Sequence, residues 1–342
     1  MFSAVVGWFS QDLALDLGTS NTRIFFPEHD TPSIAPTVVA IQSSAAGQRS
    51  LLAVGEDAQV MLGRTPQDIE AIQPVRHSKI DDFEVTEALL IHLLRQAHGR
   101  NRWMSPRMVV TLPPQTNDME RHAIRKCCES AGAREVHLIP SPIAAALGAG
   151  LPVEEPAGQM IVDIGGGSTT ISVVSLNRVV HSLNVPGGGE GMDRQIIGFI
   201  QKKYGLLIGT ATAEWVKRTL GAAAPESMPQ ELTVKGRCMK TGLPKGLKIT
   251  SDEVHAALLP TLQALAKAML QVLEISPTEL ASDIVDHGVI MVGGGSQLRG
   301  LDACLRTATS LSVFVAESPE LSAVVGARKV MESTELIEST CV

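Results

Sequence analysis

Two short phrases of the sequence place an aspartate, glycines and hydroxyl side chains directly after an apolar run. The first is LALDLGTSNTRIFF, residues 13–26, and the second is MIVDIGGGSTTISVV, residues 160–174. Asp16 aligns with Asp163, Gly18 with Gly165 and Thr22 with Thr169. The two phrases lie a little under half a chain apart. Such a repeat predicts two similar halves that carry the same chemistry.

Each phrase predicts a strand, a tight glycine-containing turn and a second strand. The tip of such a hairpin exposes backbone N–H groups that can surround phosphate oxygens, and nearby hydroxyls add donors. An aspartate at the end of the first strand points into the same space and can hold a hydrated Mg²⁺ ion. Either phrase alone is also typical of a structural turn, but the pair favours a clamp on a polyphosphate.

A third glycine run, VIMVGGGSQLRG at residues 289–300, again follows a strand and opens a helix. The sugar or a phosphate of a nucleotide could meet a helix N-terminus there. The G-x-G-x-x-G spacing of a dinucleotide fold is missing, and the chain has no G-x-x-x-x-G-K-[ST] motif.

The elements that must position these residues alternate along the chain, which predicts mixed α/β architecture with parallel strands. Apolar, β-rich runs predict strands at Leu13–Leu17, Thr37–Ile41, Met108–Leu112, Met160–Ile164, Ile171–Ser175 and Val289–Val292. Helical periodicity covers Glu84–His98, Asp118–Ser130, Ile143–Gly148, Met192–Tyr204, Ala213–Leu220, Asp252–Leu273, Gln297–Ala308 and Leu321–Glu332. Asn117 with Glu120 predicts a capping box, Pro142 suits a first helical position, and Ser251 can cap a helix. The stretches 42–50 and 221–246 have the composition of insertions.

Composition limits the function classes. A chain of 342 residues is expected to form two domains, and 44% hydrophobic with 19% charged residues suits a soluble globular protein. The net charge of −7 argues against a nucleic-acid binder, whose phosphate contacts need a basic face. The five cysteines show no C-x-x-C spacing, which favours a reduced compartment, and Cys127 and Cys128 are expected to pack in a core. There is no apolar run of about 20 residues, and the N-terminus lacks the basic region of a signal peptide.

The motifs Asp-Leu-Gly-Thr, Asp-Ile-Gly-Gly-Gly and a late Gly-Gly-Gly, in this order, resemble the phosphate and adenosine motifs of the actin, heat-shock chaperone and sugar kinase superfamily. Within it, ALDLGTSNT, VGEDAQVMLGRTP, IAAALGAGLPV and ASDIVDHGVIMVGGG resemble phrases of the MreB family, over about Ser10 to Met331. The resemblance implies an α/β, actin-like ATPase fold. Two similar halves with ribonuclease H-like cores would each carry a smaller inserted subdomain, with the nucleotide in the cleft between. The implied division is a first core subdomain (1–32, 75–141 and 318–342), a first insertion (33–74), a second core subdomain (142–186 and 250–317) and a second insertion (187–249).

The resemblance also assigns residue roles, with ATP and Mg²⁺ as cofactors. A helical Glu-x-x-Lys, here Glu214 and Lys217, would line the adenosine pocket, although on spacing alone this is equally an exposed surface pair. The implied metal ligands, acting through water, are Asp16, Asp163 and Glu190. The implied nucleotide-binding residues are Gly18, Thr19, Ser20, Asn21, Gly165, Gly166, Gly167, Ser168, Glu214, Trp215, Val216, Lys217, Gly294, Gly295, Ser296 and Gln297.

Catalysis is where the chain departs from the family. Family members place an acidic residue directly before the helix-starting proline, where it orients the attacking water, and here that position is Ser141. The Gly-Gly-Asp of the family becomes Gly-Gly-Glu at Glu190. Glu120 is the alternative catalytic carboxylate, but its capping-box position favours a structural role. The sequence therefore predicts retained nucleotide binding and at most a slow ATPase.

Two segments predict membrane contact. In residues 1–10 the apolar side chains share one helical face. In residues 95–108, Trp103 and Met104 form an exposed apolar pair among arginines, although Trp103 could also fold back onto the core. The expected contact residues are Phe2, Val5, Val6, Trp8, Phe9, Trp103 and Met104.

MreB-like chains form antiparallel double protofilaments at the inner face of the cytoplasmic membrane and help organise cell-wall synthesis. The resemblance therefore implies a homopolymer that determines cell shape, is cytoplasmic and peripheral at that membrane, and meets membrane proteins of the cell-wall elongation machinery. A divergent paralogue with weak or no ATPase, acting as a regulatory or specialised filament, is the alternative. A sugar kinase would need a general-base aspartate and a chaperone a client-binding domain, and neither is evident.

Overall fold

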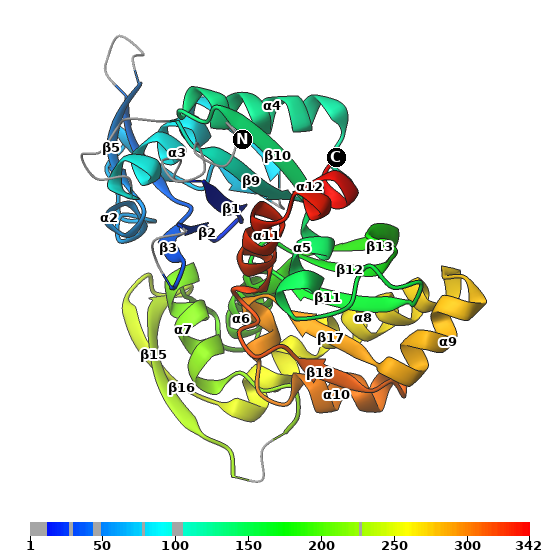
Figure 1. Ribbon diagram of the computed structural model, residues 1–342. Helices are drawn as coiled ribbons and strands as arrows, with labels where there is room; N and C mark the ends of the chain where they lie inside the picture. The colour runs from blue at the N-terminus through cyan, green and yellow to red at the C-terminus, as the bar shows by residue number, and fades with distance from the viewer. Residues whose placement is uncertain (1–11, 27–29, 44–48, 77–78, 98–104, 226–227) are drawn as a thin grey trace. The chain divides into compact units, whose positions relative to one another are not determined.

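The computed structural model describes residues 12–26, 30–43, 49–76, 79–97, 105–225 and 228–342 (Figure 1). The chain divides into two compact units, of which unit 1 comprises 1–156, 174–179 and 320–342, and unit 2 comprises 157–173 and 180–319. The four-part subdomain division predicted from the sequence stays a prediction.

Unit 1 contains a five-stranded sheet in the order β10-β9-β1-β2-β3. Strands β1, β9 and β10 run parallel, and the β1–β2–β3 meander is antiparallel. The bounds are β1 Leu13–Leu17, β2 Asn21–Phe25, β3 Ser33–Pro36, β9 Arg107–Leu112 and β10 Glu135–Pro140. A smaller sheet of β4 (Val39–Ser43), β5 (Arg49–Val54) and β6 (Ile69–Ile72) accompanies α2 (Glu56–Gln59), and β7 (Val75–Arg76) pairs with β8 (Lys79–Ile80).

Helices bury both faces of the central sheet of unit 1. The apolar sides of α3 (Phe83–Ala97) and α4 (Asp118–Ser130) join the core of the sheet, and Cys127 and Cys128 are buried there as expected. The helices α5 (Ser141–Gly148) and α11 (Ser322–Glu332) cross at unusually close range, and α12 (Thr334–Thr340) follows (Figure 1). A Cβ on Gly148 would lie 1.8 Å from the Ser322 oxygen and one on Gly326 1.7 Å from the Ala144 oxygen, so this crossing requires two glycines.

Unit 2 repeats the same sheet plan, in the order β13-β12-β11-β17-β18. Here β11 pairs in parallel with β17 and β17 with β18. The bounds are β11 Gln159–Ile164, β12 Ser168–Ser175, β13 Arg178–Pro186, β17 Val289–Val292 and β18 Val313–Val315. A hairpin followed by parallel strands in both units matches the two similar halves predicted from the repeated phrase.

The remaining elements of unit 2 form one apolar core with its sheet. They are α6 (Gly188–Tyr204), β14 (Leu206–Leu207), α7 (Thr210–Leu220), β15 (Glu231–Cys238), β16 (Pro244–Thr250), α8 (Ser251–Ile275), α9 (Thr278–His287), the 3-10 helix η1 (Gly294–Gln297) and α10 (Leu301–Thr309). By length and composition α8 could cross a membrane, yet its buried side includes Val254, Leu258, Leu262 and Met269 of this core.

Several local predictions can be compared with these bounds. β1, β17 and α4 match to the residue, and Asn117 with Glu120 forms the predicted capping box. The prediction that Ser251 caps α8 was wrong by one residue, because Thr250 is the cap and forms the box with Glu253. The single helix predicted at 297–308 is interrupted, since η1 ends at Gln297 and α10 starts at Leu301.

Candidate functional site

The turn of the first hairpin, between β1 and β2, is fixed by a threonine from the start of the next segment. Thr37 donates its hydroxyl to the Gly18 oxygen at 2.8 Å, and its N–H to the Ser20 oxygen at 2.9 Å. Because a trans peptide points its C=O and the following N–H in opposite directions, the Thr19 and Asn21 N–H groups face away from Thr37. The predicted phosphate donors of this turn are therefore oriented together.

Asp16 lies one residue before that turn and has partners on both sides. The sheet register sets Asp16 opposite Arg23 on β2 and beside Thr111 on β9. Thr111 donates its hydroxyl to Oδ1 at 2.6 Å, and the Arg23 Nη1 donates to Oδ2 at 3.2 Å. Each oxygen of the Asp16 carboxylate thus has a partner, one of them a guanidinium, and the metal role of Asp16 stays a prediction.

Ser141 lies at the same edge of the unit 1 sheet. The register aligns Asp16 with Thr111 and Thr111 with Ile139, and Ser141 begins α5 directly after β10. Two strand spacings, about 10 Å, therefore separate the Asp16 and Ile139 backbones. Ser141 therefore lies at the edge where the carboxyl ends of β1, β9 and β10 meet, and it has a hydroxyl where the resemblance implies an acidic residue.

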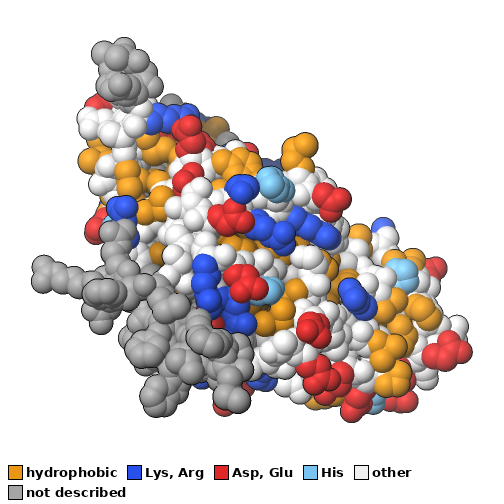
Figure 2. Space-filling view, turned by 45° about the horizontal axis from the view of Figure 1, so that its top comes forward, with side chains coloured by type: hydrophobic (Ala, Val, Ile, Leu, Met, Phe, Trp, Pro, Cys, Tyr) orange, Lys and Arg blue, Asp and Glu red, His pale blue; other side chains and the backbone are white. Residues whose placement is uncertain are grey.

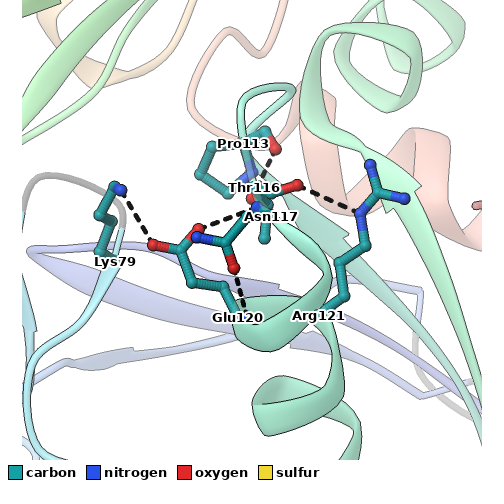
Figure 3. A network of polar contacts seen from close by, with 6 residues as sticks. All are labelled: Lys79, Pro113, Thr116, Asn117, Glu120 and Arg121. Atoms are coloured by element: carbon teal, nitrogen blue, oxygen red, sulfur yellow. Dashed lines mark hydrogen bonds and ion pairs between the residues drawn. The ribbon is translucent and has the colours of Figure 1, made fainter.

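Glu120 is fully occupied at the start of α4 (Figure 3). Its Oε1 accepts from the Lys79 ammonium at 2.9 Å, and its Oε2 accepts from the Asn117 N–H at 3.0 Å. The Asn117 side chain in turn accepts from the Glu120 N–H at 2.9 Å. The Lys79 hydrogen bond and then the Asn117 N–H hold the pKa of the Glu120 carboxyl below its usual value. A capping carboxylate with both oxygens engaged is a poor general base, in line with the structural alternative.

The second hairpin turn, Gly165–Ser168 in unit 2, is held by backbone hydrogen bonds from α6. The N-terminal segment of α6 donates to all three glycine carbonyls, with Gly189 to Gly165 at 2.9 Å, Glu190 to Gly166 at 2.8 Å and Gly187 to Gly167 at 3.0 Å. Orphan donors of a helix N-terminus are thereby satisfied. The same peptide geometry turns the N–H groups of Gly166, Gly167 and Ser168 away from α6, toward the side where a phosphate would bind.

Lys217 on α7 connects that turn to the predicted adenosine helix. Its ammonium donates to the Gly189 oxygen at 2.8 Å and lies 2.9 and 3.0 Å from the two Asp193 carboxylate oxygens. Burial raises the pKa of the Asp193 carboxyl, and the charge of Lys217 opposes that rise. The surface-pair alternative for Glu214 and Lys217 does not describe this arrangement, because Lys217 is paired with a buried aspartate.

The other predicted residues of α7 differ in exposure. Trp215 is half-exposed and Glu214 is exposed, whereas the Val216 side chain is completely buried in the core of unit 2. Of the predicted residues of α7, Glu214 and Trp215 are therefore the ones with exposed side chains.

The third glycine run packs closely against the second hairpin. A Cβ on Gly293 would lie 2.4 Å from the Asp163 carboxylate, and one on Gly295 would lie 2.3 Å from the Ile164 side chain. Gly294 and Gln297 are exposed, while the Ser296 hydroxyl donates to the Gly293 oxygen at 2.7 Å. In this run, Gly294 and Gln297 are the residues accessible to a ligand.

An arginine beyond η1 links this run to α7. The Arg299 guanidinium donates to the Gly221 oxygen at 3.1 Å and to the Thr219 oxygen at 3.3 Å. The second hairpin, α6, α7 and η1 are therefore joined by one continuous set of contacts within unit 2.

The residues that support these turns were not predicted from the sequence: Arg23, Thr37, Thr111, Asp193 and Arg299. Arg23 is the one charge in β2 and Asp193 lies beside the apolar positions of α6, so each stands out in the sequence, although neither position reveals its partner. Within the described ranges no group of three or more His, Cys, Asp or Glu is arranged to hold a metal ion. The metal roles of Asp163 and Glu190 stay predictions.

The predicted membrane contacts lie outside the described residues, since 1–11 and 98–104 are not described. On the face shown in Figure 2, basic and acidic side chains are interspersed.

The fold and its paired glycine hairpins are those of an actin-like protein. The structure is similar to MreB5 of Spiroplasma citri bound to AMPPNP, with a TM-score of 0.89 and 29% identity over 95% of this chain and 97% of that one. It also shares the fold of the MamK double helical filament, with a TM-score of 0.79 and 18% identity over 95% and 99% of the two chains.

Sequence comparison gives the family. The MreB/Mbl protein family model matches residues 10–339. The cell shape-determining protein MreB of Escherichia coli (strain K12) is 45% identical over 333 residues, 96% of each chain. The cell shape-determining protein Mbl of Bacillus subtilis (strain 168) is 38% identical over 327 residues, 96% of this chain and 97% of that one. The chain belongs to the MreB/Mbl family.

Proposed function

We propose that this protein binds ATP through its glycine hairpins and assembles into membrane-associated filaments that determine cell shape by organising cell-wall synthesis. The observation that carries the proposal is the Gly165–Ser168 turn, whose three carbonyls are bound by α6 so that its N–H groups face a common side. The resemblance to MreB5 bound to AMPPNP, and to MreB5 bound to ADP, supports a nucleotide as the ligand. The MreB and Mbl relatives support the cell-shape role.

The residues have separate tasks in this proposal. The turn N–H groups of both hairpins bind phosphate oxygens, while Glu214, Trp215 and Gln297 present side chains to the nucleoside. Lys217 holds α7 against the start of α6. Where Mg²⁺ accompanies the nucleotide, Asp163 and Glu190 are the side chains we assign to its water shell.

Slow hydrolysis is part of the proposal. Orientation of the attacking water is a main protein contribution to phosphoryl transfer, because the transition state itself is loose. Ser141 offers a short neutral hydroxyl at the position of the usual acid, and Glu120 is engaged in its cap. These two observations favour the second candidate function, a divergent paralogue with weak or no ATPase that acts as a regulatory or specialised filament.

The cellular setting follows the family. We place the filament, an antiparallel double protofilament, in the cytoplasm at the inner face of the cytoplasmic membrane, with proteins of the elongation machinery as partners. Membrane contact is assigned to the N-terminal apolar residues and to Trp103 and Met104. Replacing Trp103 and Met104 by Ser, or deleting the first nine residues, should weaken sedimentation with liposomes, and unchanged binding in both variants would contradict this assignment.

The central experiment is electron microscopy of the purified full chain with ATP and anionic liposomes. Double filaments on the membrane are expected with ATP and should be absent without nucleotide. The Gly166→Val variant places a side chain at the phosphate turn and should lose at least about tenfold in ATP affinity, roughly the value of one charge-assisted hydrogen bond. A folded variant with unchanged affinity would show that this turn does not bind the phosphates.

A further inference from the structure

Arg23 is a largely buried, charged side chain beside the first phosphate turn. It lies on β2 directly opposite Asp16 and next to the buried Ile24 and Phe25. Its side chain is only 14% exposed, and the Asp16 side chain 16%. Withdrawing a guanidinium from water to this extent is costly unless several of its donors have acceptors.

The donors of Arg23 are only partly used. A guanidinium has five N–H donors in a planar fork. Nη1 donates to the Asp16 Oδ2 at 3.2 Å, while the buried Nε has no hydrogen-bond partner among the described residues. Nη1 also lies 3.7 Å from the point where a Cβ on Gly18 would stand, which places the guanidinium against the turn itself. Donor capacity is thus left over next to the turn that the proposed function assigns to phosphate.

Asp16 is a poor place for a divalent cation. Thr111 bonds Oδ1 and Arg23 bonds Oδ2, so about half of the acceptor sites of the carboxylate are used, and the adjacent guanidinium charge repels a second cation. Mg²⁺ holds an octahedral shell of waters and ligands with little tolerance for distortion. An arginine, by contrast, matches a phosphate with two parallel N–H donors and needs no such shell.

We propose that Arg23 is a phosphate-binding residue, and that it supplies at the first hairpin the positive charge that would otherwise come from a divalent cation on Asp16. Asp16 then acts as a positioning residue, which with Thr111 fixes the guanidinium beside Gly18. This inference rests on the proposed ATP binding and adds to it how the polyphosphate is neutralised in unit 1. Its direct consequence is that nucleotide binding depends only weakly on Mg²⁺.

The test measures ATP affinity of the full chain by calorimetry, once with Mg²⁺ and once with EDTA. For the wild type the two affinities should agree within about threefold. The Arg23→Leu variant should lose at least about tenfold in EDTA, the value of one charge-assisted hydrogen bond, and recover much of that loss with Mg²⁺. The matched control is Arg49→Leu, which removes an exposed Arg–Asp pair of the same unit (Arg49 to Asp82, 2.9 Å) and should change neither affinity.

A second variant, Asp16→Asn, should change ATP affinity in opposite directions depending on whether Asp16 holds a metal ion or Arg23 is the cation. If Asp16 held a metal ion, Asp16→Asn would weaken ATP binding in Mg²⁺ about tenfold or more, with little change in EDTA. With Arg23 as the cation, the Asn oxygen still accepts from the guanidinium and keeps it in place, while a negative charge beside the phosphates is removed, so affinity in EDTA should rise about threefold. Both estimates correspond to the loss or gain of roughly one charge interaction near a surface.

The outcomes separate this inference from the proposed function. If the wild type binds ATP but loses affinity in EDTA as strongly as Arg23→Leu does, the arginine is not the cation and the inference is overturned. A fall in affinity for Asp16→Asn would overturn it as well. If the folded wild type binds no ATP in either buffer, it is the proposed function that fails.

Discussion

The two glycine hairpins share a sequence phrase but are held in different ways. In unit 1 the turn is fixed by side chains, with Thr37 on the turn carbonyls and the Asp16–Arg23 pair before them. In unit 2 the Gly165–Ser168 turn is fixed by backbone N–H groups at the start of α6. Where side chains hold the turn, one substitution can change the charge beside it. Where backbone hydrogen bonds hold the turn, a substitution can only preserve or break them.

This difference limits what each hairpin tolerates. The backbone-held turn has the sequence Gly-Gly-Gly-Ser, and glycine is required at Gly188, where α6 approaches it. The side-chain-held turn carries an arginine that changes the electrostatics of its aspartate. The hairpin with side-chain support is thus the one whose ligand chemistry can be tuned without loss of fold.

Gly188→Ala is the change that should break the second hairpin most completely. Gly188 has φ +40, and a Cβ there would lie 2.2 Å from the Gly165 oxygen and 2.8 Å from the Gly166 oxygen. Neither the turn nor the start of α6 can move without losing the hydrogen bonds between them. We therefore expect at least about 3 kcal/mol of destabilisation from overpacking and a strained φ together. Urea unfolding measures the loss, and ATP affinity should fall with it.

The same helix supplies the control. Gly198 lies in the middle of α6, and a Cβ there would meet nothing within 4 Å. Gly198→Ala should therefore stabilise by roughly 0.5–1 kcal/mol through helix propensity. If both alanines behaved alike, the contact between α6 and the turn would not be what holds this hairpin.

Lys217→Met should have the next largest effect. It leaves the Asp193 carboxylate, a mostly buried group, without its counter-charge, which costs about 3 kcal/mol at neutral pH. Burial already raises the pKa of Asp193, so the folded state binds this proton more tightly than the unfolded chain. The stability contributed by such a group is present below the unfolded pKa and lost as pH rises through the folded one. The deficit of the variant should therefore shrink as pH falls from 7 toward the acid range, as followed by urea unfolding at several pH values.

A pH-independent deficit would contradict this account, since it would indicate lost packing of the lysine stem and not an unpaired carboxylate. The Lys217→Met, Asp193→Asn double variant gives the same information in another form. It should recover most of the lost stability, because no buried charge remains.

Ser141→Glu tests the chemistry at the edge of the first sheet. A carboxylate that accepts a hydrogen bond from the attacking water contributes about 10²–10⁴-fold in general-base roles. We expect the variant to release phosphate at least about 10²-fold faster than wild type in assembled protein, with filaments that are shorter-lived. An unchanged rate with a folded, nucleotide-bound variant would show that this edge does not orient the water.

Sequence was most informative where periodicity and glycine spacing decide the structure. The exact limits of β1, β17 and α4 and the repeated sheet plan follow from local patterns. The β15–β16 hairpin was missed because its outward positions are rich in lysine, and the composition of its loop resembles an insertion. A half-exposed strand at a sheet edge carries too few apolar residues to be recognised by alternation alone.

The supports of the candidate site could not be predicted because they depend on tertiary register. Asp16 meets Thr111 only because β1 and β9 pair in parallel at that residue. Lys217 meets Asp193 only because α7 packs beside α6, which no sequence spacing expresses. Conversely, the Asn117–Glu120 box was predictable, because both partners lie within one helical turn.

Glu120→Gln should have the smallest effect and decides whether the one remaining acidic candidate of unit 1 takes part in hydrolysis. The Glu120 side chain is 28% exposed, and its contacts are an ion pair with the exposed Lys79 and half of a capping box. Such contacts contribute about 1 kcal/mol or less in total. Because Lys79 and the Asn117 N–H lower the pKa of Glu120, its contribution to stability is present above the usual glutamate range and is lost as pH falls through the folded value. The stability difference between wild type and variant, measured by urea unfolding, should therefore be small at neutral pH and disappear in acid. Phosphate release in assembled protein should not change, because the contacts with Lys79 and Asn117 hold the Glu120 carboxylate in its cap and, by lowering its pKa, make it a weaker base. A tenfold fall in the rate of phosphate release, with stability nearly intact, would instead show that Glu120 takes part in hydrolysis and that the position of Ser141 does not orient the water.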